Sequence, residues 1–496
     1  MSCSPRAEFE AYQRAAETLH ALIRGERFAS NSAASRRQRA EVRLKRVAAV
    51  LGAVGNPQRR YPVVHITGTS GKGSTAAAIA AVLSAAGYRV GLRTSPYLQV
   101  ATEKLQIGPS LIDAHSFAEM AARVLGVAGR QIRLGGAELP FSYAEAWSVL
   151  GYWWFAERTV DIAVVEVGAG GRLDATNVID PIASVITSVG LDHLVTLGPS
   201  ITDIAWHKAG IIKPGSTAIV GDLPAEALSV IAEEAKRASV DLIQAHASHG
   251  SRPDVPPVGQ GFRARNADVA GAVASVLIQR GFRISEAAIA NGLRSARLPG
   301  RLERMPGTIE PAVWIDGAHN EDKIAALTLE AAGHFGAGAL PVIVVGMLSS
   351  KDSSGILARL GGAASTIIAT EPSVIGKESV AADALAEAVA ASGFAGAVYA
   401  EPTPDAAVRL AEDVARRDGA DVLVTGSMYL AGQVRRRWFP DRDVVLQRNS
   451  WPGVNEESGL GPLRPVRRLV CDKADSKGDE TADQQESADV DELVVR

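Results

Sequence analysis

Short apolar runs rich in β-branched residues recur along this chain, and each is followed by glycines and an alanine-rich helical stretch. The clearest runs before residue 247 are Val63–Ile66, Ile162–Val167 and Ile182–Thr187. Strands that alternate with helices in this way build a parallel sheet covered by helices. A second alternation of the same kind follows residue 262. The sequence therefore predicts an α/β fold with two sheets.

The length of 496 residues is about three times that of a common single domain, which favours several domains. A Pro- and Gly-rich, sparsely charged stretch separates the two alternations and marks a boundary. From residue 471 onward, nine acidic residues face three basic ones without any aromatic residue, a composition typical of disorder. We predict a helical N-terminal segment (1–60), an α/β domain with a mainly parallel sheet (61–246), a linker (247–261), a smaller second α/β domain (262–440), and an extension (441–496) whose acidic, disordered tail begins near residue 471.

Charge and cysteine content exclude several classes of protein. With 52 Lys and Arg against 55 Asp and Glu, the net charge of −3 provides no global field that attracts nucleic acid or an anionic membrane. The two cysteines, Cys3 and Cys471, exclude a disulfide framework and a thiolate metal cluster. The chain has no apolar run of a membrane-spanning length and does not begin like a signal peptide. We expect a cytoplasmic monomer that binds neither membranes nor nucleic acid.

The strongest local signal is the glycine-rich turn His65–Thr75, which lies between an apolar strand and an alanine-rich helix. Its three glycines allow the backbone to direct several N–H groups and a helix N-terminus toward one ligand, and a polyphosphate suits such a site. Lys72 is expected to reach the terminal phosphates, and Ser74 or Thr75 to position phosphate or magnesium. The standard P-loop spacing is not met, because its first glycine is missing. A tight turn of purely structural use is the alternative.

Polar residues follow two neighbouring predicted strands. Glu166 closes an apolar strand and leads into Gly168–Asn177, and Asp192-His193 follows the next strand. Parallel sheets bind ligands at the carboxyl ends of their strands, and Mg²⁺ prefers oxygen donors. Taken alone, such a glutamate is more often a surface residue and such a histidine a structural one. Their common place at one sheet edge favours a metal site.

Eight motifs occur in the order found in one known family. They are Gly68–Thr75, Thr94–Leu98, Glu166–Asn177, Asp192–His193, Lys208–Ile211, Pro299–Glu303, Asp316–Asn320 and Thr425–Ser427. Over residues 40–435 the chain resembles the folylpolyglutamate synthases and dihydrofolate synthases of the Mur ligase superfamily. The resemblance implies an ATP-dependent ligase that joins a carboxylate, dihydropteroate or a folyl glutamate, to the amino group of L-glutamate. It also implies an acyl phosphate intermediate and the release of ADP and phosphate. On this resemblance, residues 61–246 are expected to form a P-loop-type ATPase domain, and residues 262–440 a smaller Rossmann-like α/β domain.

The resemblance assigns roles to individual residues. The expected catalytic residues are Lys72, Glu166, His193 and Lys208. The residues expected to bind ATP are Gly68, Thr69, Ser70, Gly71, Lys72, Gly73, Ser74, Thr75, Arg301 and Asp316. Two Mg²⁺ ions are implied, one held by Ser95 and Glu166 and one by Glu166, His193 and Lys208. The residues expected near the pterin acid or the glutamate are Arg172, Asp174, Ala175, Thr176, His319 and Ser427. Because a protonated lysine cannot ligate a cation, Lys208 is expected to carry a carbamate, as in the family.

Several positions depart from the family pattern. Phe262-Arg263 replaces the usual His-Gln, Leu348–Asp352 lacks the first Lys-Asp of the usual motif, and Tyr97 replaces a histidine. Arg43 stands where a small residue is common in a pterin-contacting loop. It belongs to a basic cluster at 36–46 that either forms a solvated helix face or lines an anionic ligand site. These departures concern the acid substrate rather than the ATP chemistry.

Two other functions compete with the folate ligase. One is a paralogous amide ligase that uses another acid or amine in specialised metabolism, and the other is a nucleotide-binding regulatory protein. The set Glu166, His193 and Lys208 argues against the regulatory protein, because a switch needs no second metal. Retention of Arg172–Asn177 and of Phe141–Tyr143 favours the folate enzyme.

Overall fold

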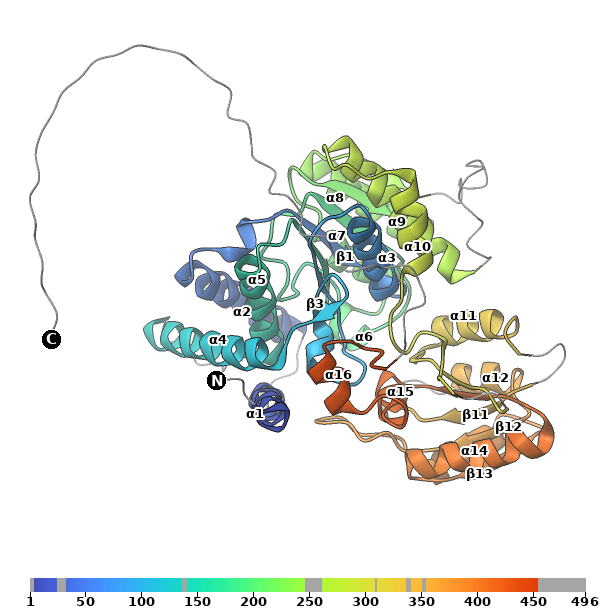
Figure 1. Ribbon diagram of the computed structural model, residues 1–496. Coiled ribbons are helices and arrows are strands. Elements are labelled where there is room, and N and C mark those ends of the chain that lie inside the picture. Colours follow the sequence, from blue (N-terminus) through green and yellow to red (C-terminus); the bar gives the residue numbers. More distant parts are fainter. Residues whose placement is uncertain are drawn as a thin grey trace, which may run out of the picture. The chain divides into compact units, whose positions relative to one another are not determined.

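The computed structural model describes residues 4–24, 33–135, 141–245, 261–307, 310–335, 340–349 and 354–453. They belong to one compact unit, Met1–Val454, drawn in Figure 1. Nearly all of the predicted linker and the acidic tail from 471 lie outside the described residues. No helix in the described ranges is long and apolar enough to cross a membrane.

The first sheet has eight strands in the order β4-β3-β2-β5-β1-β6-β7-β8. Their bounds are β1 Val63–Thr67, β2 Val90–Arg93, β3 Leu105–Ile107, β4 Ser110–Leu111, β5 Ile162–Glu166, β6 Ala183–Ile186, β7 Thr217–Val220 and β8 Leu242–Gln244. Only the pairs β2–β3 and β3–β4 are antiparallel. The central strands β1 and β5 are buried along their whole length, as expected for β-branched runs covered on both faces. The predicted, mainly parallel first sheet is therefore confirmed.

Helices cover both faces of this sheet. One face carries α1 (Pro5–Arg24), α2 (Ala33–Ala53), α4 (Ala114–Gly135) and α5 (Tyr143–Glu157), and the other carries α3 (Lys72–Ala85), α9 (Phe262–Gln279) and α10 (Glu286–Ser295). Beyond β6 lie α6 (Leu194–Leu197), α7 (Ile201–Ala209) and α8 (Ala225–Ala238). Successive strand residues alternate between the two cores, so that Val63 and Val165 face the first core while Val64 and Val164 face the second.

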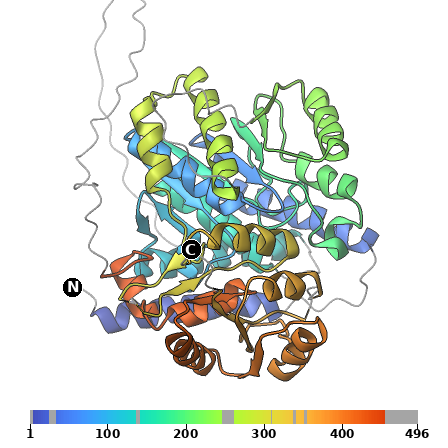
Figure 2. The same cartoon turned by 90° about the vertical axis from the view of Figure 1, so that its right-hand side faces the viewer.

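The position of α9 and α10 differs from the predicted start of the second domain at residue 262. Both helices pack against α3, and Figure 2 shows them in yellow-green beside the blue strands of the first sheet. Gly292 of α10 lies so close to Val82 of α3 that a β-carbon would collide with the backbone there. Residues 262–295 therefore cover the first sheet. Helical periodicity predicted the helix but did not reveal which sheet its apolar face covers.

The second sheet has six strands in the order β13-β12-β11-β14-β10-β9. The strands are β9 Glu303–Arg304, β10 Val313–Ile315, β11 Val342–Val345, β12 Thr366–Ala369, β13 Ala397–Ala400 and β14 Val422–Thr425. The connecting helices are α11 Glu321–Ala331, α12 Ser354–Gly361, α13 Ala382–Ala391, α14 Pro404–Asp418, α15 Met428–Arg435 and α16 Asp441–Gln447. All pairs except β9–β10 are parallel, which confirms the second α/β sheet.

The chain after residue 440 continues the folded unit up to residue 453. Arg435, which has no exposed surface, pairs with the Glu303 carboxylate at 2.9 Å, and Trp451 Nε1 donates to the same carboxylate at 2.7 Å. The Arg448 carbonyl accepts from the Leu111 N–H of β4 at 2.9 Å. The first part of the predicted extension therefore packs against both sheets, through side chains that are remote in sequence.

Candidate functional site

The glycine-rich loop between β1 and α3 needs glycine at two positions for different reasons. Gly71 precedes α3 with a φ of 82°, in the left-handed region, and a β-carbon there would collide with Asn266 Oδ1. At Gly73, a β-carbon would lie 3.0 Å from Leu298 Cδ2 and 3.5 Å from Glu166 Oε2. The loop can therefore approach both α9 and the end of β5 only because these residues have no side chain.

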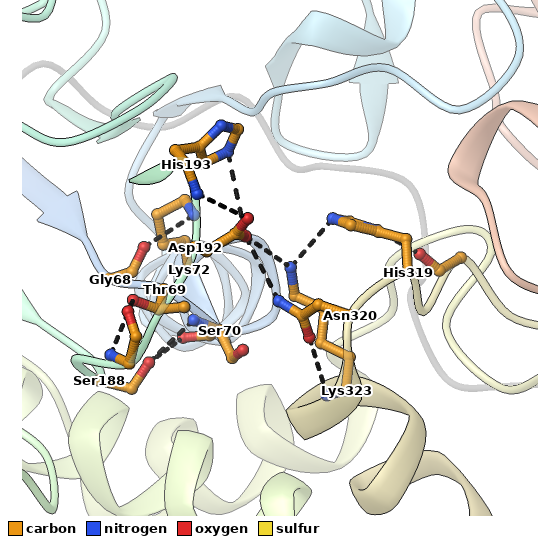
Figure 3. A network of polar contacts seen from close by, with 12 residues as sticks. Gly68, Thr69, Ser70, Lys72, Ser188, Asp192, His193, His319, Asn320 and Lys323 are labelled. Carbon is orange, nitrogen blue, oxygen red and sulfur yellow. Dashed lines mark hydrogen bonds and ion pairs between the residues drawn. The ribbon is translucent and has the colours of Figure 1, made fainter. Parts of the chain in front are cut away.

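The loop is held by the chain that follows β6, as Figure 3 shows. Thr69 Oγ1 donates to the Gly190 carbonyl at 3.0 Å, and Ser188 Oγ accepts from the Ser70 N–H at 2.8 Å. Thr187 Oγ1 donates to the Ser70 carbonyl at 2.6 Å. Among the described residues, the buried Ser70 hydroxyl has no hydrogen-bond partner. The loop is thus rigid before any ligand binds.

Lys72 is half-buried at the start of α3, and its ammonium group donates to the Gly68 carbonyl at 2.8 Å. Burial lowers the pKa of Lys72, while the carboxylates of Glu166 and Asp192 act in the opposite direction. A cation is therefore held above the loop by nearby carboxylates rather than by solvent.

Two cavities lie beside the glycine-rich loop, and Lys72 lines the smaller one. The larger encloses about 380 Å³, and Gly73, Ser95, Glu166 and Arg301 are among its lining residues. The smaller encloses about 220 Å³ and is lined by Gly68, Thr69, Lys72, Ala169, Gly170, Asp192, His193, Leu197 and Lys208. Residues from both sheets thus meet at the carboxyl ends of β1 and β5, where open parallel sheets bind ligands.

Glu166 and Ser95, one of the predicted metal pairs, are in contact. The Glu166 side chain is 4% exposed, and its Oε2 accepts from the Ser95 N–H at 2.7 Å. Burial raises the pKa of Glu166, and the nearby Lys72 opposes this effect. The Glu166 carboxylate therefore lies against the backbone of Ser95 at the end of β5, and both residues line the larger cavity.

The predicted second metal set is only partly assembled. His193 and Lys208 line the smaller cavity, whereas Glu166 lines the larger one. Lys208 in α7 is 2% exposed, and burial lowers its pKa well below the ordinary lysine value. In the described part of the chain, no cluster of three His, Cys, Asp or Glu side chains is arranged to hold a metal. A metal in the smaller cavity would therefore need a further oxygen ligand.

Asp174 organises the loop after β5. Its carboxylate accepts from the Ala169 N–H at 3.1 Å, the Thr176 N–H at 3.0 Å and the Thr176 hydroxyl at 2.6 Å. Thr176 has no exposed surface and also bonds His65 Nε2 at 2.9 Å, while Ala175 is 8% exposed. The substrate contacts expected for Thr176 and Ala175 stay predictions. Their burial makes them supports of the loop.

Arg172 connects the same loop to α7. Its Nε donates to the Trp206 carbonyl at 3.2 Å, its guanidinium lies 4.3 Å from the Trp206 ring centroid, and it pairs with Glu234 at 3.0 Å. Arg37 of the basic cluster lies over the same indole ring at 5.2 Å. The guanidinium of Arg172 is thus committed to α7 and α8, and a direct substrate contact stays a prediction.

Two predicted residues of the second sheet, Asp316 and Ser427, are held by their own loops. Asp316, 4% exposed, accepts from the N–H groups of Leu302 and Ala318, both at 2.7 Å, and so shapes the turn that carries Arg301. Ser427 caps α15 by accepting from the Tyr429 N–H at 3.1 Å. The side chains of Asp316 and Ser427 therefore accept hydrogen bonds from backbone N–H groups, whereas Arg301 lines the larger cavity.

Sequence reasoning missed three residues around this site. Asp192 lines the smaller cavity, and Asn320 Nδ2 donates to its carboxylate at 3.3 Å. Lys323 pairs with the same carboxylate at 3.8 Å. Asp192 and Asn320 lie within recognised motifs, which was a usable signal. Lys323 lies outside every motif, so nothing local distinguished it.

Comparison with known proteins places these features in a family. The Mur ligase middle domain matches residues 66–252, and the Mur ligase glutamate ligase domain matches residues 300–428. The folylpolyglutamate synthase of Lacticaseibacillus casei is 34% identical over 427 residues, covering 79% of this chain and 93% of the relative. The chain belongs to the folylpolyglutamate synthase family.

Further members of the folylpolyglutamate synthase family match along most of their length. The dihydrofolate synthase/folylpolyglutamate synthase of Mycobacterium tuberculosis is 31% identical over 439 residues, covering 79% of this chain and 89% of the relative. The solved FPGS complex with AMPPCP and folate superposes with a TM-score of 0.69 at 29% identity, covering 86% of this chain and 99% of that one. The chain is therefore an ATP-dependent carboxylate–amine ligase built on two Mur ligase domains.

Proposed function

We propose that this ligase joins L-glutamate to a folate-type acid, either dihydropteroate, a folyl glutamate or both, and converts ATP to ADP and phosphate. The observation that carries the proposal is the meeting of the glycine-rich loop, the Glu166–Ser95 pair and Arg301 at one cavity. The names of the relatives support the substrate class, and the solved complex with AMPPCP and folate supports both small molecules.

The reaction needs two transfers because a carboxylate is a poor electrophile. A carboxylate oxygen first attacks the γ-phosphorus of ATP, and the bond to the β-phosphate oxygen breaks to release ADP. The amino group of glutamate then attacks the resulting acyl phosphate, loses a proton and expels inorganic phosphate. Both steps bring anions together, so fixed positive charge is the main requirement.

The chain supplies this charge on a rigid frame. The N–H groups at the start of α3 would face the phosphates, and Lys72 and Arg301 would neutralise the phosphate oxygens. Asp174 keeps the loop after β5 in one conformation, which would orient the acid carboxylate toward the γ-phosphate. His319 and the Ser427 loop would receive the amino acid.

The residues present fit a magnesium-dependent reaction. Glu166 and the Ser95 hydroxyl would hold one Mg²⁺, and His193 with a carbamylated Lys208 would hold a second. The fit of the carbamate rests on Lys208 itself, because burial lowers the pKa of this amine and so favours the neutral form, which is the form that adds CO₂. Bound magnesium would supply charge neutralisation at the phosphoryl oxygens. We further propose a cytoplasmic monomer.

The test is release of ADP by the purified protein, with dihydropteroate and then tetrahydrofolate as the acid and with glutamate present or absent. We expect ADP release that requires both an acid and glutamate, together with a product heavier by one glutamate residue. If neither pterin acid leads to ADP release, the folate assignment is overturned. Failure to restore growth of a host that lacks dihydrofolate synthase would overturn it as well. Glutamate-independent binding of ATP without turnover would indicate a regulatory protein instead.

A further inference from the structure

Lys323 lies where the amino-acid side of the proposed site meets the smaller cavity. It stands in the first turn of α11, and its side chain is 18% exposed. Its Nζ lies 3.1 Å from His319 Nε2 and 3.8 Å from Asp192 Oδ2. Figure 3 shows the ammonium group between these two side chains. None of the roles implied by the family motifs uses this lysine.

The contacts of His319 determine its hydrogen-bonding state. Nδ1 lies 2.8 Å from the Gly317 carbonyl, which can only accept, so Nδ1 must carry the proton. The ammonium group of Lys323 can only donate, so Nε2 must be the unprotonated acceptor. Both ring nitrogens are thereby occupied. The Gly317 carbonyl and Lys323 together fix the tautomer and the rotation of the imidazole.

Asp192, the second partner of Lys323, is also held by neighbouring residues. Asn320 donates through Nδ2 to Asp192 at 3.3 Å, while its Oδ1 accepts from the Lys323 N–H at 3.0 Å and caps α11. A β-carbon at Gly190 would lie 3.0 Å from Asp322 Oδ2, so the first turn of α11 is tightly apposed to the loop before Asp192. That loop also holds Thr69 of the glycine-rich loop. A continuous set of contacts thus runs from the phosphate side to His319.

We propose that Lys323 is a positioning residue for the attack by the amino acid. It holds the His319 imidazole in one tautomer and one orientation, and it connects that ring to Asp192 at the wall of the cavity lined by Lys72 and Lys208. The inference rests on the proposed place of His319 beside the incoming glutamate. Loss of the ammonium group leaves the ring held at Nδ1 alone and breaks the connection to Asp192, so glutamate binding weakens while the phosphate loop stays intact.

The experiment compares Lys323→Met, Lys323→Arg and Asp192→Asn in the full-length protein. For Lys323→Met we expect the KM for glutamate to rise about tenfold or more, the size expected for a lost charge-assisted hydrogen bond. The KM for ATP should stay within about threefold, because no contact of the glycine-rich loop is removed. Lys323→Arg should restore most of the glutamate affinity. Lys323→Met combined with Asp192→Asn should lose less than the two single changes predict together, because the two groups act through one contact.

A matched control is Lys236→Met, which removes an exposed lysine in the last turn of α8 and should leave both KM values unchanged. Circular dichroism and the thermal midpoint establish that each variant is folded. A folded Lys323→Met with an unchanged glutamate KM, or with equal rises in both KM values, overturns the inference.

His319→Ala separates this inference from the proposed function. If that variant raises the glutamate KM and Lys323→Met does not, the function stands and the positioning role is wrong. If neither change affects it, His319 lies outside the amino-acid site and the inference is wrong with it. A wild-type protein without ligase activity would refute the proposed function before any variant is tested.

Discussion

Replacing Lys104 should stabilise this protein in a pH-dependent manner. Lys104 ends the short helix Ala101–Lys104 and is only 6% exposed. Its ammonium group lies 5.2 Å from the ring centroid of Trp147, 5.3 Å from that of Tyr143 and 6.0 Å from that of Tyr97. In the described part of the chain, no hydrogen bond or ion pair reaches this group. A lysine in such surroundings loses its hydration without a carboxylate to replace it.

Burial, with a smaller contribution from Arg93, lowers the pKa of Lys104 from 10.5 to about 7. This shift corresponds to about 5 kcal/mol of lost preference for the charged form. The three rings favour the ammonium group by about 2 kcal/mol in total, so burial is the larger effect. Because the folded-state pKa lies below the unfolded value, the unfolded chain holds the extra proton between pH 7 and 10.5. Lys104 therefore costs most stability at or below pH 7, and its cost shrinks as the pH rises.

Lys104→Met removes this cost while retaining an unbranched side chain among the rings. We expect the variant to exceed the wild type by about 3 kcal/mol in free energy of unfolding at pH 8 and by about 2 kcal/mol at pH 9. Urea unfolding of both proteins at pH 7, 8 and 9 measures the difference. Lys236→Met should show no pH-dependent difference. If the stability advantage of Lys104→Met stays constant from pH 7 to 9, burial does not lower the pKa of Lys104 and the reasoning is refuted.

Three further changes test the site. Lys72→Ala should abolish ATP turnover in a folded protein, because the lysine contacts ligand rather than core; wild-type ADP release would disprove the phosphate-loop assignment. Lys208→Ala should lose activity that short carboxylic acids partly restore by replacing the carbamate oxygens, and mass spectrometry showing an unmodified Lys208 in a fully active enzyme would contradict this. Asp174→Ala should raise the KM for the acid substrate while nucleotide binding persists, and it should lower stability by about 1–3 kcal/mol because three hydrogen bonds lose their acceptor. If fluorescence titration shows that nucleotide binding and acid binding weaken equally, that result would argue against the assignment of Asp174.

Local features of the sequence predicted what local physics controls. The buried strands β1 and β5 are rich in β-branched residues that favour extended backbone, so their type and parallel arrangement followed from composition and spacing. Gly71 was recognisable because glycine adopts a left-handed backbone at low cost, whereas other residues do not. Glu166 was named beforehand because strand ends in a parallel sheet converge at one edge, whereas Ser95 was named from the family resemblance.

Long-range packing decided the rest. Thr176 stood in a substrate motif, yet its hydroxyl is buried between His65 and Asp174. Arg172 was also expected to contact the substrate, but its guanidinium stacks on Trp206 of α7. Trp206 lies 34 positions later in the chain. The motif specified which residues are present, but only the fold decided which of them face a cavity.

The sequence by itself determined two α/β sheets, the glycine-rich loop and the family. Each of these depends on residues close together in the chain or on the order of motifs. Only the tertiary structure decided that α9 and α10 cover the first sheet, that residues 441–453 pack against β4, and that Lys323 meets Asp192. The reason is physical: an apolar helix face or a charged side chain has the same local signature whichever partner it meets. The partner is selected by burial and charge pairing between segments more than 100 residues apart, and such segments leave no periodic trace in the sequence.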